Sequence, residues 1–573
     1  MRKRVAVEST AEAYLELLAA RGVEYFFGNA GTDFAPIIDA YAKREAQGQV
    51  LPRPLTIPHE IPAVAMAHGY AMVTGRPQVV MVHVNVGTAN GAGGIINAAR
   101  ANAPILFSAG RTPLTEGALP GARNRQIHWA QESFDQAAML REYVKWDYEL
   151  RMGAQLETVV DRALAVATSE PAGPVYLTLP REVLAERLQE IEYFDPPRLR
   201  ADAERVPDPA AIEEAARALI AARNPIVIAK SGGRDPRAVA PLVTLAETLG
   251  LPVFEWHHSH VNFPQDHPLH AGYDPTPHLG DVDVVVVVES DAPWFPKLKA
   301  PRPEANIIQI GQDPLFSRYP IRGFAVDLGL GGAPRLTFAA LTDAARRIGV
   351  DAHAVTERRA RWEAEHRRLR QAWSAAGRKA QDDRPIDMLG LSRAIGERLD
   401  ASTLVVNEYD LDPTQTCFRA PGTYFGAPAS SGLGWGLGAA LGAKLAAPEK
   451  TVICAVGDGS YIFGAPLAAH WVARAHNLPV LFVIFNNRAW NAVKRSVKAY
   501  APEGWSVRTG VMPLSELDPA PDYELVARAC GGWGERVEDP AALPGAMDRA
   551  IADVGNLKRQ ALLNVICGPG GTA

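Results

Sequence analysis

Cysteine is scarce in this 573-residue chain. Its four cysteines are scattered, and no pair has the spacing of metal ligands; they are Cys417, Cys454, Cys530 and Cys567. Such a set does not provide the disulfide framework of a secreted protein and is typical of thiols kept reduced. We therefore expect a cytoplasmic protein.

An excess of positive charge and a long apolar run are also lacking. Lys and Arg number 59 against 64 Asp and Glu, a net charge of -5, which argues against a nucleic-acid-binding surface. No apolar run reaches the length of a membrane span. The basic residues 1–4 lead into a polar, amphipathic run at 8–18, so no signal peptide is expected. Neither nucleic acid nor a membrane is therefore expected as a partner.

The chain does contain alternating short apolar runs and helical patterns, which favour parallel sheets covered by helices. We predict three consecutive open parallel-sheet α/β domains at residues 1–190, 205–350 and 380–573. The expected strands are 25–27, 79–84, 105–108, 175–179, 226–229, 253–255, 282–288, 307–310, 404–407, 452–456, 481–485 and 562–566. The expected helices of the first domain are 34–43, 62–73 and 89–101.

Two passages between these blocks have a distinct composition. Residues 195–209, rich in proline and charge, indicate a linker, and the basic run 356–373 indicates a solvated connecting helix. A histidine cluster, His257-His258-Ser259-His260, lies in the central block. Metal binding, simple surface polarity and a catalytic role are all open for it.

The most informative pattern is near the C-terminal end. Gly457, Asp458, Gly459 and Ser460 follow one apolar strand, and Asn486-Asn487 follow the next. In open α/β sheets ligands bind beyond the carboxyl ends of the strands. Asp and Asn oxygens suit Mg²⁺ or Ca²⁺, while glycines and a helix N-terminus suit a diphosphate. The pattern predicts a metal-diphosphate anchor.

This pattern resembles the signature of enzymes that use thiamine diphosphate (ThDP, or thiamine pyrophosphate). Glu60, which follows Pro58-His59 and opens an apolar helix, and the run on to Gly87-Thr88-Ala89-Asn90 resemble their pyrimidine-binding domain. The domain order is similar to that of the acetolactate synthase, pyruvate oxidase and benzoylformate decarboxylase superfamily. The closest likeness is to benzoylformate decarboxylase, through residues 28–32, 82–88 and 423–434.

The resemblance implies a role for each matching residue. Asp458, Asn487 and the carbonyl of Ala489 would bind Mg²⁺. Leu433 would bend the cofactor, and Glu60 would share a proton with its pyrimidine ring. His83 would move protons on the substrate, and Thr32 would hydrogen-bond the substrate carboxylate. Gly457, Gly459, Ser460 and Glu408 would lie along the diphosphate.

The implied reaction is non-oxidative decarboxylation of a 2-oxo acid through a ylide and an enamine. The site would form between subunits, which requires at least a homodimer and leads us to expect a homotetramer. An alternative is an acetolactate-synthase-like carboligase that joins two carbonyl substrates. A third reading is a non-catalytic ThDP-fold scaffold. FAD, common in acetolactate synthases, is not favoured, because Ser231-Gly232-Gly233 is a generic turn.

Three departures bear on the benzoylformate likeness. The central segment Ala292–Leu298 lacks the second histidine of that enzyme. Asp410 stands near positions where the family places hydroxyl groups on the diphosphate; it either points away or belongs to a rebuilt loop. The pocket residues Trp490, Ala492 and Ser496 also differ.

Overall fold

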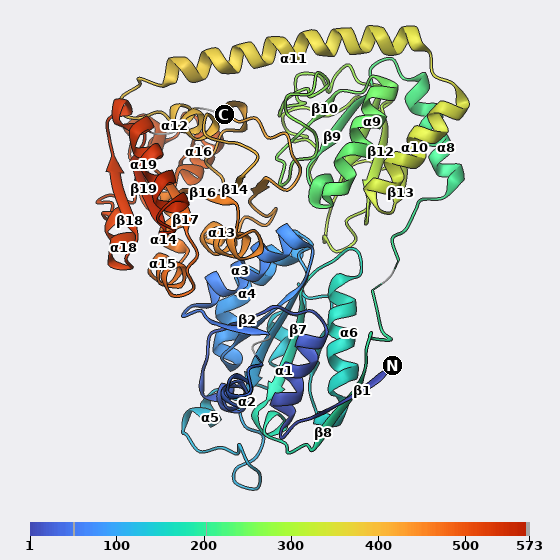
Figure 1. Cartoon of the computed structure of the whole chain (residues 1–573). Coiled ribbons are helices and arrows are strands. Elements are labelled where there is room, and N and C mark those ends of the chain that lie inside the picture. Colours follow the sequence, from blue (N-terminus) through green and yellow to red (C-terminus); the bar gives the residue numbers. More distant parts are fainter. Residues whose placement is uncertain (50–51, 202, 569–573) are drawn as a thin grey trace.

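The computed structural model describes residues 1–49, 52–201 and 203–568. They form three α/β domains, as the sequence predicts, with the N-terminal domain below the other two in Figure 1. No helix among the described residues is both long and apolar enough to cross a membrane.

The N-terminal domain contains a six-stranded parallel sheet in the order β3-β2-β4-β5-β7-β6. A separate antiparallel pair, β1 with β8, ties the chain start to the domain end. The strands are β1 (Arg2–Ala6), β2 (Tyr25–Gly28), β3 (Arg53–Thr56), β4 (Gln78–Val82), β5 (Ile105–Arg111), β6 (Asp147–Glu149), β7 (Val175–Pro180) and β8 (Glu190–Phe194). The helices are α1 (Thr10–Ala20), α2 (Ala35–Ala46), α3 (Glu60–Thr74), α4 (Val84–Arg100), α5 (Ile127–Ala130), α6 (Leu156–Thr168) and α7 (Arg181–Leu184).

The central domain is a five-stranded parallel sheet in the order β10-β9-β11-β12-β13. Its middle strand reads as five consecutive valines, all buried, as expected when helices cover both faces. The elements are β9 (Ile226–Ala229), β10 (Val253–Phe254), β11 (Val284–Val288), β12 (Asn306–Gly311) and β13 (Leu328–Gly331), with α8 (Pro209–Ala221), α9 (Val239–Leu249) and α10 (Pro334–Ile348).

The C-terminal domain has a second six-stranded parallel sheet, in the order β15-β14-β16-β17-β19-β18. Its strands are β14 (Thr403–Glu408), β15 (Tyr424–Gly426), β16 (Thr451–Gly457), β17 (Val480–Asn486), β18 (Trp533–Val537) and β19 (Ala561–Ile566). Its helices are α12 (Met388–Gly396), α13 (Trp435–Ala446), α14 (Asp458–Phe463), α15 (Pro466–Ala475), α16 (Asn491–Tyr500), α17 (Trp505–Thr509), α18 (Tyr523–Ala529) and α19 (Leu543–Gly555).

A single long helix, α11 (Ala352–Ala380), joins the central domain to the C-terminal domain and runs along the top of Figure 1. Near its start, Arg358 donates hydrogen bonds to the carbonyls of Ala222 and Leu249 in the central domain. Near its end, Gly377 packs against Gln415 of the C-terminal domain. The basic run predicted to be a connecting helix is therefore one, although it is anchored at both ends.

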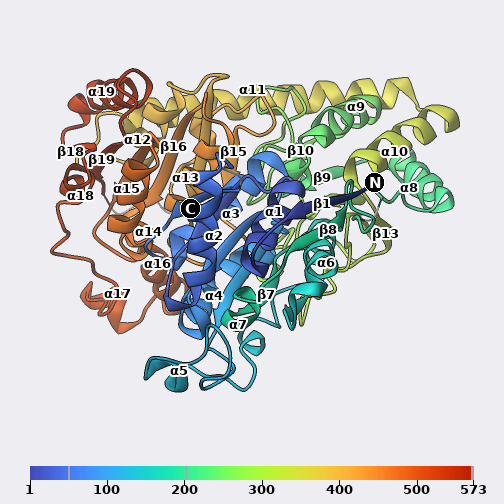
Figure 2. The same ribbon diagram turned by 60° about the horizontal axis from the view of Figure 1, so that its bottom comes forward.

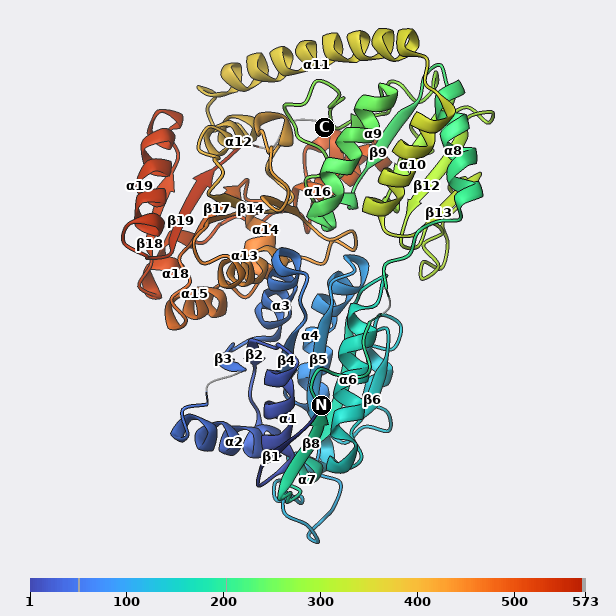
Figure 3. The same ribbon diagram turned by 45° about the vertical axis from the view of Figure 1, so that its right-hand side comes forward.

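Helices α3 and α13 form the contact between the N-terminal and C-terminal domains, and they lie side by side in Figures 2 and 3. Glycines make this approach close. A Cβ on Gly69 would lie 2.0 Å from the carbonyl oxygen of Ala439, and one on Gly442 would lie 2.0 Å from that of Met66. The two halves of the predicted site are carried by domains that share this closely packed seam.

Candidate active site

The first predicted site residue, Glu60, begins α3. The His59 side chain caps the helix by accepting a hydrogen bond from the Ile61 N–H at 3.2 Å. Glu60 is buried, and one of its carboxylate oxygens accepts a hydrogen bond from the Asn90 amide of α4 at 2.5 Å. A helix N-terminus favours a carboxylate, so the backbone and Asn90 together fix this side chain.

His83 lies between β4 and α4, at the carboxyl end of its strand as predicted. Its Nδ1 is 2.6 Å from Oδ1 of Asp33, a buried carboxylate after β2. The hydrogen bond to Asp33 raises the pKa of His83; burial lowers it, and the charges of Asp33 and Glu60 raise it further. Thr32, by contrast, is exposed at the start of a short 3-10 turn. Sequence reasoning selected Thr32 and missed Asp33, its neighbour.

Asp458 is the first residue of α14 and follows β16 directly. It is only 1 % exposed, and its Oδ2 has no hydrogen-bond partner among the described residues. Burial raises its pKa to about 6, while the backbone N–H groups of Gly459, Arg488 and Ala489 act in the opposite direction. A buried carboxylate oxygen without a protein partner fits a cation ligand.

The two asparagines after β17 have different roles. Asn486 is fully buried and donates to Asn564 of β19 at 2.9 Å, which ties two strands together. Asn487 is half-buried, and its Oδ1 accepts the N–H of Ala489 at 3.0 Å. Because Arg488 and Ala489 also point N–H groups at Asp458, this turn and Asp458 face each other. The structure thus brings Asp458 and the 487–489 turn together, while the carbonyl of Ala489, a predicted ligand, accepts the Asn491 N–H at 2.9 Å.

Gly459 lies under the ring of Trp490. A Cβ at position 459 would be 2.5 Å from Cζ3 of that ring, so a side chain there would displace it. The glycine of the Gly-Asp-Gly turn is therefore required by close packing. Sequence reasoning singled out Trp490 only as a difference in the pocket, not as the cover of this turn.

Glu408 holds the start of α13. Its two carboxylate oxygens accept the N–H groups of Gly434 at 2.8 Å and Gly436 at 2.6 Å, and burial raises its pKa to about 7. The neighbouring Leu433 is half-buried. Glu408 therefore positions the backbone beside Leu433, a role that the motif alone did not reveal.

Asp410 does not point away from the turn. Its Oδ2 is 2.3 Å from the position that a Cβ on Gly457 would occupy. Desolvation raises its pKa to about 7, and the nearby charge of Asp458 adds to the rise. Of the two alternatives raised by the sequence, orientation away from the site is wrong.

Two of the three central histidines, His258 and His260, pack between the central and C-terminal domains, whereas His257 is exposed. His258 stacks on Tyr273 and Tyr424 at ring-centroid distances of 5.4 and 4.7 Å, and His260 meets Phe425 edge-on at 5.5 Å. Within the described residues no group of three or more His, Cys, Asp or Glu side chains is arranged to hold a metal. The surface-polarity reading is wrong for the buried His258 and His260.

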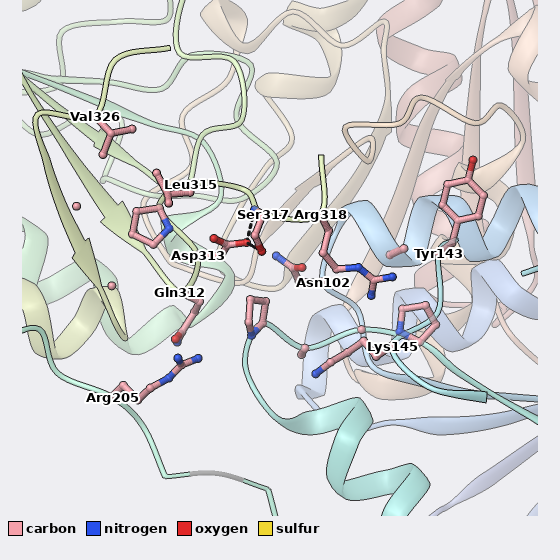
Figure 4. A pocket seen from close by; sticks show the side chains of 18 residues that line it. Asn102, Tyr143, Lys145, Arg205, Gln312, Asp313, Leu315, Ser317, Arg318 and Val326 are labelled. Atoms are coloured by element: carbon pink, nitrogen blue, oxygen red, sulfur yellow. Dashed lines mark hydrogen bonds between the residues drawn. The ribbon is translucent and has the colours of Figure 1, made fainter. Parts of the chain in front are cut away.

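A cavity of about 720 Å³ lies elsewhere, between the N-terminal and central domains, and Figure 4 shows Arg318 reaching across it. Its cations already hydrogen-bond to backbone carbonyls. Arg318 donates to Glu142 and Val144, and Lys145 donates to Val166 at 2.6 Å. Arg318 therefore links the central domain to the N-terminal domain, whereas the Lys145 contact lies within the N-terminal domain. None of the predicted site residues lines this cavity.

Three family models match the chain in the order of its domains. The thiamine pyrophosphate enzyme N-terminal TPP binding domain covers residues 8–139, the central domain 212–341, and the C-terminal TPP binding domain 412–565.

Curated relatives match over almost their whole length. Benzoylformate decarboxylase of Pseudomonas aeruginosa is 27% identical, over 95% of this chain and 97% of that protein. Sulfoacetaldehyde acetyltransferase of Rhodobacter capsulatus is 27% identical, over 95% and 92%. The large subunit of acetolactate synthase isozyme 3 of Escherichia coli is 26% identical, over 96% and 93%.

The fold matches that of a solved thiamine diphosphate-dependent 4-hydroxybenzoylformate decarboxylase from Rhodococcus jostii RHA1. The TM-score is 0.77 with 22% identity, over 98% of this chain and 99% of that one. At this identity the likeness establishes the fold alone.

Proposed function

The chain belongs to the thiamine pyrophosphate enzymes, and on this premise we propose that it catalyses the Mg²⁺-dependent, non-oxidative decarboxylation of a 2-oxo acid. The observation that carries the proposal is the buried Oδ2 of Asp458, which has no hydrogen-bond partner in the described part of the chain and lies opposite the 487–489 turn. An anionic oxygen in that position needs a cation to offset its desolvation.

The fit of the cofactor follows from the same residues. Asp458, the Asn487 side chain and the Ala489 carbonyl would hold Mg²⁺. Gly457, Gly459 and Ser460 would lie against the diphosphate, with Leu433, held through Glu408, under the bend of the cofactor. ThDP, when bound, supplies the electron sink for loss of CO₂.

The N-terminal domain supplies the proton chemistry. Glu60, fixed by Asn90, would share a proton with the pyrimidine ring of the cofactor. His83 would exchange a proton with the substrate at its Nε2, the ring nitrogen that does not face Asp33. Thr32 is exposed beside His83 and would hydrogen-bond the substrate carboxylate.

We propose that a second copy of the chain completes each site, giving at least a homodimer and, by expectation, a homotetramer. Apolar side chains are exposed beside both halves of the site. Val86 on α4 is 50% exposed, and Phe463 on α14 and Trp471 on α15 are 53% and 43% exposed. Helix α16 has no buried residue. The four cysteines are unpaired, which supports a reducing, cytoplasmic location.

A carboligase of the acetolactate synthase kind is the second candidate. The sulfoacetaldehyde acetyltransferase and acetolactate synthase relatives are as similar to this chain as the decarboxylase is. The same site would then pass its substrate fragment to a second carbonyl compound. A non-catalytic scaffold is disfavoured, because it would not need the buried Glu60 and the unpartnered Asp458 together.

The test is reconstitution of the full-length apo protein with ThDP and Mg²⁺. CO₂ release is followed across a panel of 2-oxo acids, and the products are identified. Glu60→Gln is run beside wild type, with Glu45→Gln, at an exposed position on α2, as matched control.

We expect an aldehyde as sole product, lost in Glu60→Gln and retained in the control. A two-carbonyl adduct would move the enzyme to the carboligases. Equal turnover in wild type and Glu60→Gln would refute the proposed role of Glu60, and tight ThDP binding without turnover on any substrate would favour the scaffold.

A further inference from the structure

Asp33 makes two contacts that together set the position of His83. Its Oδ1 is 2.6 Å from the His83 Nδ1, and its Oδ2 accepts the N–H of Val84 at 3.3 Å. One carboxylate thus holds both the imidazole ring and the backbone immediately after it. Asp33 is 3% exposed, so neither contact competes with bulk water.

Two glycines make room for this pair. A Cβ on Gly31 would lie 2.1 Å from the His83 Nδ1, and a Cβ on Gly110 of β5 would lie 1.9 Å from the Asp33 Oδ2. Any side chain at either position would push the pair apart. The backbone at the start of the 3-10 turn after β2 and in β5 is therefore shaped around the carboxylate-imidazole contact.

The junction after His83 is also strained. Val84 has φ of 34°, a left-handed conformation that a β-branched residue rarely adopts. Such a conformation is strained and persists only where the surroundings impose it. The Val84 N–H contact to Asp33 is one of those surroundings, and its effect is to turn the chain sharply into α4 with His83 at the corner.

The other ring nitrogen of His83, Nε2, contacts Gln131, in the loop between β5 and β6. The His83 Nε2 is 3.3 Å from the Gln131 Nε2, while the Gln131 Oε1 is buried without a partner among the described residues. With Nδ1–H facing Asp33, the neutral ring accepts the Gln131 N–H at Nε2. A half-turn of the amide would present Oε1 to a protonated Nε2. One side chain can therefore serve both protonation states.

We propose that Asp33 is a positioning residue that fixes the tautomer of His83. Gln131 is the second partner of the His83 ring, and the Gln131 amide rotates when the His83 Nε2 gains or loses a proton. This inference rests on the proposed function and deepens it. In the forward transfer, the Nε2 lone pair takes a proton from the substrate and a new N–H bond forms, while the bond that held the proton breaks and its electron pair stays on the substrate. The positive charge is shared with Asp33, and the reverse transfer returns the proton.

The charges around the ring favour this assignment. Asp33 on the 3-10 turn and Glu60 on α3 raise the pKa of His83. His128 on α5 also faces it, and the pKa of His128 is lowered, first by burial and then by nearby arginines. Among these groups only Asp33 touches the ring.

The test is the pKa of His83 itself, measured by NMR on the full-length protein with ¹³C-labelled histidine and assigned with His83→Gln. Asp33→Asn keeps the volume and removes the charge. Asp39→Asn, at an exposed position on α2, is the matched control. Gln131→Glu is a second variant, which replaces the reversible amide with acceptors only.

We expect Asp33→Asn to lower the pKa of His83 by about 1 unit or more, and Gln131→Glu to raise it. In Asp33→Asn the limb of the kcat–pH profile assigned to His83 should move to lower pH with the NMR pKa, and kcat should fall by up to about 100-fold. Asp39→Asn should leave both unchanged.

An unshifted His83 pKa in both Asp33→Asn and Gln131→Glu would overturn the proposal, as would a kcat–pH profile that does not follow the pKa. Because the NMR measurement needs no substrate, its outcome is separate from that of the turnover panel. A shifted pKa in a protein that decarboxylates nothing would leave the positioning intact and refute the reaction.

Discussion

The six-stranded sheets of the N-terminal and C-terminal domains share one topology. Counted along the chain within each six-stranded sheet, both have the strand order second, first, third, fourth, sixth, fifth. In both, the helix after the second strand, α3 or α13, faces its counterpart across the domain contact. The carboxyl end of the third strand carries His83 in one and Asp458 in the other.

The two equivalent positions differ in what surrounds them. His83 has a carboxylate on one side and an amide on the other, so its proton-exchanging atoms are partnered. Asp458 keeps an oxygen buried with no hydrogen-bond partner within residues 1–49, 52–201 and 203–568. Topology therefore specifies where a functional side chain stands, whereas the residues on the neighbouring strand ends decide whether it handles a proton or a cation.

The strongest way to break this comparison is Asp458→Ala. Loss of a buried charged ligand should weaken Mg²⁺-dependent ThDP binding by about 3 kcal/mol or more, roughly a hundredfold. His83→Ala should leave binding nearly unchanged while lowering turnover. Calorimetric titration of ThDP with and without Mg²⁺ measures binding in both variants, and CO₂ release measures their turnover. Equal loss of ThDP binding in the two variants would contradict the assignment of cation binding to Asp458 and of proton transfer to His83.

The packing of the two equivalent helices is tested by Gly69→Ala. Its Cβ would lie 2.0 Å from the Ala439 carbonyl oxygen, so α3 and α13 must separate, at a cost of about 1–3 kcal/mol. Gly93→Ala on α4 meets nothing within 4 Å and should instead stabilise the helix by about 0.5–1 kcal/mol. Thermal unfolding of both variants gives the comparison, and equal melting temperatures would contradict the close seam.

The same seam should be sensitive to acid through His68 of α3, which accepts a hydrogen bond from the Trp435 indole at 3.1 Å. Burial lowers the pKa of His68 to about 3. Its contribution to stability is therefore complete above about pH 6.5 and is lost as pH falls toward 3, by about 1.4 kcal/mol per pH unit.

Urea unfolding at pH 7.5, 6.5 and 5.5 should therefore show wild type losing more stability than His68→Gln below pH 6.5. The difference between variants is the quantity to compare, because Glu408, whose pKa is raised to about 7, changes stability with the opposite sign in both. Parallel pH profiles would mean that His68 takes up its proton over the same pH range in the folded and the unfolded protein.

A smaller effect is expected at Asn97, a residue of α4 that hydrogen-bonds to the C-terminal domain. Its amide accepts from Gly432 and Ser430 at 3.0 and 2.8 Å and donates to the Gly432 carbonyl at 2.8 Å. Asn97→Ala should loosen the loop before Leu433 and weaken ThDP binding by about 1–2 kcal/mol, roughly 5- to 30-fold. Asn97→Asp, which keeps only the acceptor, should fall between. Unchanged ThDP titrations would separate this loop from the cofactor.

The sequence predicted the parts of the site that follow regular elements. Glu60 begins a helix, and Asp458 and Asn487 follow buried strands, because apolar runs and helix starts are local signals. It missed Asp33, which lies 50 residues from His83 and meets it only because β2 and β4 are neighbours. The strand expected at 79–84 ends at Val82, since the strained Val84 already belongs to α4. Long-range pairing and backbone strain leave no local pattern to read.

The long helix α11 sets a constraint on how this chain can change length. Its 29 residues span about 44 Å, and each residue added or removed would rotate one end by about 100° relative to the other. Arg358 near one end and Gly377 near the other could not then both keep their partners. Insertions here are therefore tolerable only in steps close to whole turns, whereas the surface loops of the same domains can take single residues. The distance between the central and C-terminal sheets can therefore change only in steps of about one turn of α11.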